Sequence, residues 1–134
     1  MRRHGNASCG RGACELFGAT VGIVGSAGIG RALGPPPCGL RGKRSWPPTS
    51  SGPRIFAQEH GIRRVNLDEL FAVSDIVTLH CPLMDATRGL VDAARLASMK
   101  PGAILVNAAR GGIVDETALA AALERGVIRG AAID

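Results

Sequence analysis

The sequence predicts an α/β fold built around a doubly wound parallel sheet. Short runs of apolar or β-branched residues, at 20–25, 75–79, 103–106 and 127–133, alternate with helical stretches, as in chains of βαβ units. A glycine-rich turn follows the first run and opens a helix. Hydrophobic residues make up 46% of the 134 residues, a length and composition that suit one globular domain.

Composition and charge narrow the classes of function. Aromatic residues make up 3% of the chain and Tyr is absent, which argues against a nucleic-acid module built on aromatic stacking. The net charge of +5 is uneven: residues 1–64 hold ten Lys and Arg against two acids, and residues 65–134 hold six against nine. A basic half can indicate a nucleic-acid partner. The excess of basic residues is explained more simply by one atypical segment, residues 34–53, so no nucleic-acid partner is expected.

Cysteine usage and the start of the chain make the cytoplasm the expected location. Cys9, Cys14, Cys38 and Cys81 form no Cys-x-x-Cys pair and no paired histidines accompany them, so neither a metal site nor a disulfide framework is expected. Residues 1–14 are rich in Gly, Arg and Cys without periodicity and are predicted to be a loose leader. Their basic start lacks the apolar segment of a signal peptide. No apolar run approaches membrane-spanning length, so no membrane partner is expected.

The first strand is predicted at 20–25, directly before the glycine-rich turn. A dinucleotide pyrophosphate binds to the backbone N–H groups of such a strand–turn–helix unit. Gly25 and Gly30 fit the Gly-x-Gly-x-x-Gly pattern, but Ala27 occupies the middle position and Gly28 comes one residue late. A tight turn needed only for packing would use the same glycines, so this motif alone is weak evidence.

The pattern breaks over residues 34–53, where ten of 20 residues are Pro or Gly and none is acidic. This composition favours neither a helix nor a central strand, so the second strand region is expected to be disrupted. In a dinucleotide-binding fold an acid at that strand's end would bind the adenosine ribose of NAD. The basic trio Arg41, Lys43 and Arg44 would suit NADP, but it is not expected at a strand end. The choice between NAD and NADP stays open.

Regular structure is expected again from about residue 55. Residues 56–61 resemble the end of a helix stopped by glycine. Asn66, with Glu69 three residues later, predicts the capped start of a short helix. A strand at 75–79 then ends before Pro82, which cannot continue a ladder.

The last third of the chain contains two helices and two strands. Asp92 is predicted to cap a helix that runs to about residue 99, and a strand buried on both faces follows at 103–106. Asp115 opens a helix at 116–125, with Leu119, Ala122 and Leu123 expected on one face and Gly126 as its stop. A final strand is expected at 127–133.

Candidate functional residues follow two of these strands. Ligands bind beyond the carboxyl ends of strands in an open α/β sheet. Arg110, flanked by small residues after strand 103–106, could bind a planar anion such as a carboxylate, although a solvated loop arginine is the simpler alternative. His80 is more often a loop cap than a ligand contact, and Cys81 suits a small packed residue better than a nucleophile.

Two long blocks, residues 70–91 and 99–115, resemble signatures of the NAD-dependent D-isomer-specific 2-hydroxyacid dehydrogenases, and are most similar to the phosphoglycerate dehydrogenase type. The resemblance covers 15–33 and 54–134. It implies a Rossmann-like dinucleotide-binding domain over 15–134, with 34–53 aberrant, and NAD as the cofactor. Because 34–53 has foreign composition at a preserved length, we hypothesise two compensating frame shifts; an intact reading frame on resequencing would refute this.

The resemblance also implies roles for individual residues. Arg110 matches the catalytic arginine, which binds the substrate carboxylate and polarises the carbonyl oxygen where charge develops. The histidine acid/base of the family, and the glutamate that orients it, would lie beyond Asp134. The positions that correspond to cofactor contacts are Gly25, Gly28, Ile29, Gly30, Cys81, Pro82, Thr87, Ala108, Ala109, Arg110 and Asp134.

The expected activity of the parent protein is hydride transfer between nicotinamide and a small D-2-hydroxy or 2-keto acid of the 3-phosphoglycerate kind. Without the acid/base, whose proton transfer typically contributes about 10²–10⁴-fold, this chain alone is expected to be nearly inactive. A homodimer is the expected assembly. Two alternatives remain open: a non-catalytic NADH-binding module for interaction or dimerisation, as in corepressors, and a decayed gene product.

Overall fold

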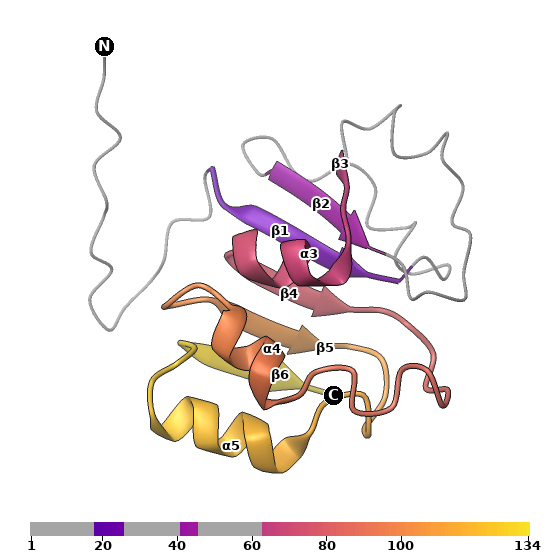
Figure 1. Ribbon diagram of the computed structural model, residues 1–134, viewed down its shortest axis with the longest axis vertical. Helices are drawn as coiled ribbons and strands as arrows, with labels where there is room; N and C mark the ends of the chain where they lie inside the picture. Colours follow the sequence, from indigo (N-terminus) through magenta and orange to yellow (C-terminus); the bar gives the residue numbers. More distant parts are fainter. Residues whose placement is uncertain (1–17, 26–40, 46–62) are drawn as a thin grey trace.

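A computed structural model describes residues 18–25, 41–45 and 63–134. These residues form one six-stranded sheet with three helices (Figure 1). The strands are β1 (Thr20–Val24), β2 (Arg41–Ser45), β3 (Arg63–Arg64), β4 (Ile76–Leu79), β5 (Ile104–Asn107) and β6 (Gly130–Ile133). The helices are α3 (Leu67–Val73), α4 (Ala93–Ser98) and α5 (Glu116–Glu124).

All neighbouring strands of the sheet are parallel, in the order β3-β2-β1-β4-β5-β6. The chain therefore builds outward from β1 in one direction and then returns to build outward from β4 in the other. This is the strand order of a doubly wound Rossmann fold, which confirms the predicted class. The order reverses between β1 and β4, and ligands bind at the carboxyl ends of the strands at such a point.

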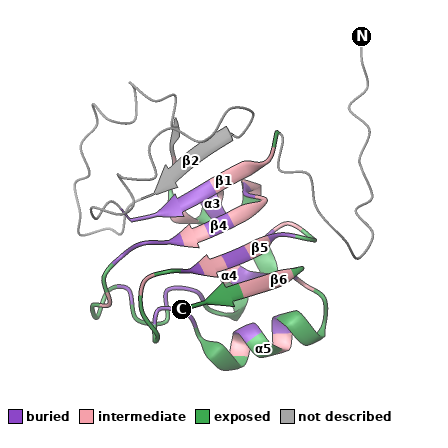
Figure 2. Ribbon diagram, turned by 180° about the vertical axis from the view of Figure 1, so that it is seen from behind, coloured by how far each residue is buried: buried purple, intermediate pink, exposed green. Residues whose placement is uncertain are grey.

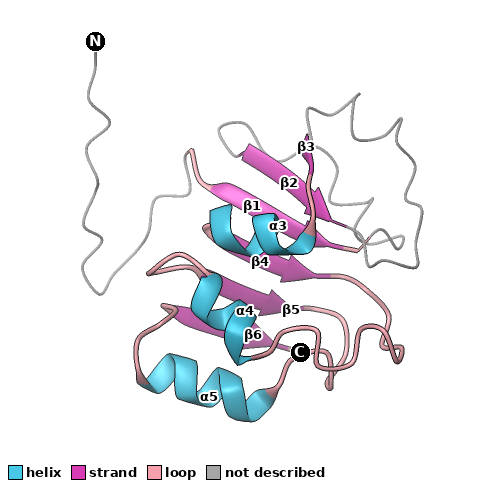
Figure 3. Ribbon diagram, in the orientation of Figure 1, coloured by secondary structure: helices cyan, strands magenta, loops and turns pink. Residues whose placement is uncertain are grey.

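The helices α3 and α4 cover one face of the sheet: they lie in front of it in Figure 1 and behind it in Figure 2. Helix α5 lies beside α4, near the β6 edge (Figure 3). No helix among the described residues is long and apolar enough to cross a membrane. The leader at 1–14, the helix predicted after Gly25 and the helix end predicted at 56–61 fall outside the described residues.

Each of the three helices begins at the polar residue that the sequence predicts. The Oδ1 atom of Asn66 accepts a hydrogen bond from the N–H of Glu69 at 2.7 Å. Asp92 accepts from the N–H of Arg95 at 2.8 Å, and Asp115 caps α5 in the same way. These bonds satisfy N–H groups that have no partner inside the helix, which explains why these residues start helices.

The core lies between the sheet and these helices, as the buried residues in Figure 2 show. Its largest fully buried side chains include Leu70 and Phe71 of α3 and Leu96 of α4. The expectation that the strand now seen as β5 is buried on both faces is wrong: only every second residue of Ile104–Asn107 is fully buried. Leu123 was expected on the buried face of α5 but is 38% exposed, because only Leu119 and Ala122 face the core.

Gly22, in the middle of β1, allows α3 to approach the sheet closely. A Cβ atom at this position would lie 2.6 Å from Cδ2 of Leu70 and would also collide with the side chain of Ser74. The Ser74 hydroxyl is buried and donates to the carbonyl of Leu70 at 2.6 Å, so this surface of the helix has little freedom to move. The glycine is therefore needed for packing between helix and strand.

The strand β2 corrects the expectation that no strand forms within 34–53. Arg41–Ser45 pairs with β1 over its whole length and with the two-residue strand β3, which the sequence did not predict. The five residues contain no proline, and ladder hydrogen bonds use backbone groups that do not depend on side-chain type. Pairing between two other strands therefore overrides the unfavourable composition.

Candidate functional site

The predicted site residues follow the carboxyl ends of neighbouring strands. Gly25 follows β1, His80–Pro82 follow β4, and Ala108–Arg110 follow β5. The N–H of His80 donates to the carbonyl of Val24 at 2.7 Å and extends the β1–β4 ladder by one residue. Because the strands are parallel and adjacent, these segments meet at one edge of the sheet.

A groove of about 490 Å³ opens at this edge. Five of the residues around it were predicted from the sequence: Cys81 and Pro82 after β4, and Ala108, Ala109 and Arg110 after β5. The full lining consists of His80, Cys81, Pro82, Leu83, Ala108, Ala109 and Arg110. The volume lies within the range of small-molecule sites, about 300–1,000 Å³, and the walls are mainly apolar with one guanidinium.

Gly25 follows β1 and lies against the backbone of the loop that follows β4. Its φ of +108° lies in a region that L side chains rarely adopt. A Cβ atom there would lie 2.6 Å from the carbonyl oxygen of His80 and 2.8 Å from the backbone N of Cys81. The described structure thus explains this glycine by close approach of two backbones. Gly28, Ile29 and Gly30 lie outside the described residues.

Asn107 organises the loop that carries Arg110, a role that sequence reasoning missed. Its side chain is 1% exposed at the end of β5. The Nδ2 atom donates to the carbonyl of Arg110 at 2.9 Å, and Oδ1 accepts from the N–H of Ala109 at 3.1 Å. The carboxamide therefore closes the turn on itself and fixes the backbone on one side of the groove. An asparagine at a strand end before a short loop was the available signal.

The Arg110 side chain is exposed at the rim of the groove. Its Nη1 atom donates to the carbonyl of Ala109 at 2.8 Å, which engages one of the guanidinium donors. A guanidinium has five N–H donors in a planar fork that matches a carboxylate. The geometry therefore suits the binding of an anion at the open side of the groove.

Thr87 is fully buried in the loop after β4 and does not line the groove. Its hydroxyl donates to the carbonyl of Pro82 at 2.6 Å and accepts from the N–H of Met84 at 2.8 Å. These bonds shape the turn that follows Pro82. The described contacts give Thr87 a role in holding the wall of the groove.

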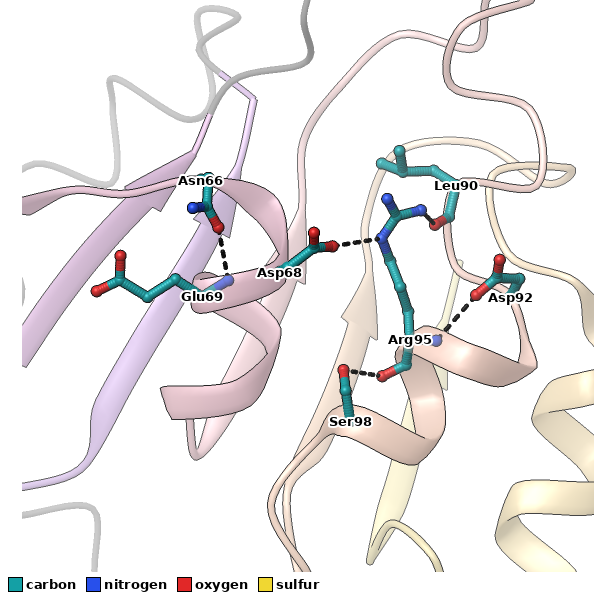
Figure 4. Close-up of polar contacts among 7 residues, drawn as sticks. All are labelled: Asn66, Asp68, Glu69, Leu90, Asp92, Arg95 and Ser98. Carbon is teal, nitrogen blue, oxygen red and sulfur yellow. Dashed lines mark hydrogen bonds and ion pairs between the residues drawn. The ribbon is translucent and has the colours of Figure 1, made fainter.

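The loops after β4 and β5 are joined to each other by backbone hydrogen bonds. The N–H of Gly89 donates to the carbonyl of Gly112, and Val91 and Val114 form an isolated parallel bridge. Arg95 of α4 supports this pair of loops, because its Nη1 donates to the carbonyl of Leu90 (Figure 4). The two sides of the groove are thus held together as one unit.

Arg95 also faces α3. Its Nε atom lies 3.7 Å from Oδ1 of Asp68, a carboxylate whose side chain is 88% exposed, as Figure 4 shows. A distance of this length is an ion pair without a direct hydrogen bond, and exposed pairs of this kind contribute little to stability. The bond from Arg95 to Leu90 is therefore the contact that matters for the loops.

His80 lies in the wall of the groove, and Asp134 lies outside it. The Nε2 atom of His80 lies 2.9 Å from Oγ1 of Thr78, and the ring is mostly buried in the groove wall. Asp134 is exposed beyond β6; its N–H donates to the carbonyl of Asn107, and its side chain does not line the groove. Among the described residues, no cluster of three or more His, Cys, Asp or Glu forms a metal-binding arrangement.

Cys81 is packed into the groove wall, as expected from its sequence context. It is 2% exposed, and burial raises the pKa of its thiol. Only the thiolate reacts with alkylating agents, so both effects slow the reaction at neutral pH.

We expect iodoacetamide to alkylate Cys81 at least about tenfold more slowly in the folded chain than in the denatured chain at pH 8. Because the pKa is raised, the rate in the folded chain should continue to climb with pH where an ordinary thiol approaches saturation. Peptide mass spectrometry of timed samples measures both rates on the same cysteine. Equal rates in the folded and denatured chain would contradict the packing described here.

Comparisons with known proteins find a matching family and similar sequences. Residues 2–134 match the family described as "D-isomer specific 2-hydroxyacid dehydrogenase, NAD binding domain". D-3-phosphoglycerate dehydrogenase of Mycobacterium bovis is 42% identical over 121 residues, which cover 90% of this chain and 22% of that protein. The chain thus spans about a fifth of the length of such curated relatives.

Solved structures show the same fold. The pyruvate reductase of Chlamydomonas reinhardtii is 39% identical, with a TM-score of 0.79, over 95% of this chain and 37% of that one. D-lactate dehydrogenase from Lactobacillus jensenii, solved with NAD+, is 31% identical, with a TM-score of 0.80, over 91% of this chain and 36% of the other.

Proposed function

The chain belongs to the D-isomer-specific 2-hydroxyacid dehydrogenase family, and on this premise we propose that it is the dinucleotide-binding part of an enzyme that transfers a hydride between nicotinamide and a D-2-hydroxy or 2-keto acid. The family's domain binds NAD, which supplies or accepts the hydride when bound. The observation that carries the proposal is the Asn107–Arg110 turn, which places a guanidinium at the rim of a groove at the carboxyl edge of the sheet.

In this proposal Arg110 is the residue that acts on the substrate. Its guanidinium binds the carboxylate and polarises the adjacent carbonyl oxygen, where negative charge develops as the carbonyl is reduced. The hydrogen bond from the Asn107 side chain to the carbonyl of Arg110 fixes the backbone that carries this group before the substrate arrives, so less ordering is needed at the moment of reaction. The names of the curated relatives favour a substrate of the 3-phosphoglycerate kind.

The remaining roles are proposed for the cofactor. Small residues at the groove leave the backbone accessible to a flat ring. The apolar walls of the groove are formed by Cys81, Pro82, Ala108 and Ala109. Thr87 holds the wall from behind. Gly25, with Gly28, Ile29 and Gly30, would contact the pyrophosphate, and Asp134 the carboxamide of the nicotinamide. Residues 15–134 would form this domain, preceded by a leader at 1–14.

We also propose a homodimeric assembly in the cytoplasm. Two large apolar side chains near the β6 edge, Leu123 and Ile133, are 38% and 50% exposed and offer surface for a second copy. Sedimentation equilibrium of the purified chain would distinguish a dimer from a monomer.

The test is NADH binding to the purified chain, read from the fluorescence of the reduced nicotinamide. We expect saturable binding that NAD+ displaces. Saturating NADH should also slow the alkylation of Cys81, because a bound ring would cover the groove that this residue lines. Binding that leaves Cys81 as reactive as before would place the nucleotide elsewhere. A folded chain that binds no dinucleotide would refute the proposal.

A further inference from the structure

A second arginine lies beside the loop that carries Arg110. Gly112, two residues after Arg110, has no side chain, and a Cβ atom added to it would lie 3.8 Å from Nη1 of Arg88. The same Cβ atom would lie 3.6 Å from Cδ1 of Leu83, a residue that lines the groove. The Arg88 guanidinium therefore lies against the same glycine as a residue of the groove wall, and close to Arg110 along the chain.

Backbone hydrogen bonds hold the segment that carries Arg88. The N–H of Arg88 donates to the carbonyl of Met84 at 2.9 Å, within the turn after β4. The N–H of Gly89 donates to the carbonyl of Gly112 at 2.8 Å, across to the loop after β5. The segments that carry Arg88 and Arg110 are thus tied to each other, so that the two arginines are presented as a pair.

Neither of these two guanidinium groups has an acidic partner within the described part of the chain. Arg88 and Arg110 are both exposed. The ion pairs formed among the described residues involve other cations: Arg95 with Asp68, and Lys100 with Asp75. Two cations that are held near each other without a counter-charge attract an anionic ligand, and most strongly one that can contact both.

We propose that Arg88 forms a second anion subsite beside the groove, and that the substrate carries a phosphate monoester there in addition to the carboxylate that Arg110 binds. The inference rests on the proposed function, because it assigns a specificity residue to the same site. Arg110 acts on the reacting end of the substrate, whereas Arg88 selects for the group at its remote end.

The chemistry of a phosphate monoester suits this subsite. The group carries a charge of about −1.5 to −2 at neutral pH and three acceptor oxygens, and a guanidinium can donate two parallel hydrogen bonds to them. When the carboxylate is bound at Arg110, the phosphate on the same molecule has a raised effective concentration at Arg88. Free phosphate lacks this advantage, and a substrate with an uncharged remote end gains nothing from Arg88.

The alternative is that Arg88 is a solvated surface arginine without a ligand. It would then respond to anions as any exposed arginine does, and Arg125 provides the comparison. Arg125 is the exposed C-cap residue of α5. Because α5 begins after β5 and ends before β6, Arg125 lies towards the amino edge of the parallel sheet, away from the groove.

Residue-by-residue protection from phenylglyoxal, which modifies accessible arginines, tests the subsite on the purified chain. D-3-phosphoglycerate, D-glycerate and inorganic phosphate are compared at equal concentration and ionic strength. We expect phosphoglycerate to slow modification of both Arg88 and Arg110 at least about threefold, because a bidentate contact covers the guanidinium. Glycerate should protect Arg110 alone, and inorganic phosphate should protect Arg88 less than phosphoglycerate does. No ligand should protect Arg125.

Peptide mass spectrometry resolves these rates within one sample. Cleavage before aspartate places the three arginines on different peptides, because aspartates divide the chain between them: Asp85, Asp92 and Asp115.

Substitutions give an independent measure of the same subsite, read from phosphorus NMR titrations with D-3-phosphoglycerate. Arg88→Gln should weaken binding about tenfold, as expected for the loss of one charge-assisted contact. Arg88→Lys should recover part of the loss, because lysine keeps the charge but not the planar fork. Arg125→Gln, with the same change in charge as Arg88→Gln, should stay within about twofold of the unmodified chain, because a distant exposed charge is screened. Circular dichroism spectra establish that each variant is folded.

Two results would overturn the inference and leave the proposed function standing. One is phosphoglycerate that protects Arg88 no more than Arg125, and the other is inorganic phosphate that protects Arg88 as well as phosphoglycerate does. In both cases glycerate would still protect Arg110 and NADH would still bind. If glycerate did not protect Arg110 and NADH did not bind, the proposed function would be overturned together with the inference.

Discussion

Gly25→Ala should lower the free energy of unfolding by roughly 3 kcal/mol or more, through two additive costs. The φ of +108° is strained for an L side chain, which costs about 1–3 kcal/mol. The new Cβ would also lie 2.6 Å from the carbonyl oxygen of His80, and relieving that contact must move one of two paired strands. Urea unfolding followed by circular dichroism measures the loss.

Substitutions at two other glycines separate the cost of backbone strain from the cost of steric contact. Gly89 has a φ of +61°, and a Cβ added there would have no atom within 4 Å, so Gly89→Ala should show the backbone cost alone, about 1 kcal/mol. Gly22 lacks a positive φ, so Gly22→Ala should show only the cost of overpacking against Leu70, about 1–3 kcal/mol. If Gly25→Ala were no worse than Gly89→Ala, the close approach of β1 to His80 would not constrain the fold.

Features that depend on neighbouring residues were predictable from the sequence. Asn66, Asp92 and Asp115 were recognised as helix starts because an N-cap acts within three residues. Four strands were recognised as apolar runs, although β6 begins at Gly130, three residues later than expected. A parallel sheet also brings successive strand ends to one edge, which is why Arg110 and Cys81 could be placed at the same site.

Features that depend on distant contacts were not predictable. The pairing of β2 with β1 joins segments about 20 residues apart, and nothing in the composition of Arg41–Ser45 indicates it. The exposure of Leu123 depends on which face of α5 packs against the core, where Leu119 and Ala122 are buried. Local bonds within loops were also missed: an asparagine at a strand end gives a signal for Asn107, but the partners of Asn107 and Thr87 become visible only when the loop conformation is known.

Asn107→Ala should destabilise the chain by about 2–4 kcal/mol, because it removes both hydrogen bonds that close the turn before Arg110. The side chain is 1% exposed, so water does not readily replace the lost partners. The released turn should also weaken dinucleotide binding, since Ala108 and Ala109 form one wall of the groove. Urea unfolding and NADH titration of the same variant measure the two effects.

Asn107→Asp tests the mechanism with almost no change in shape. The carboxylate can still accept from the N–H of Ala109, but it cannot donate to the carbonyl of Arg110. Burial should raise the pKa of the new carboxyl group, and its protonated form recovers the donor. A group whose pKa is raised by folding stabilises the fold below its unfolded pKa and loses this effect as pH rises through the folded value. The loss of stability relative to the unmodified chain should therefore shrink as the pH falls.

Ser98→Ala, which removes a hydrogen bond at an exposed site, should cost within about 0.5 kcal/mol at any pH. A deficit of Asn107→Asp that is independent of pH would mean that the donated bond to Arg110 does not hold the turn.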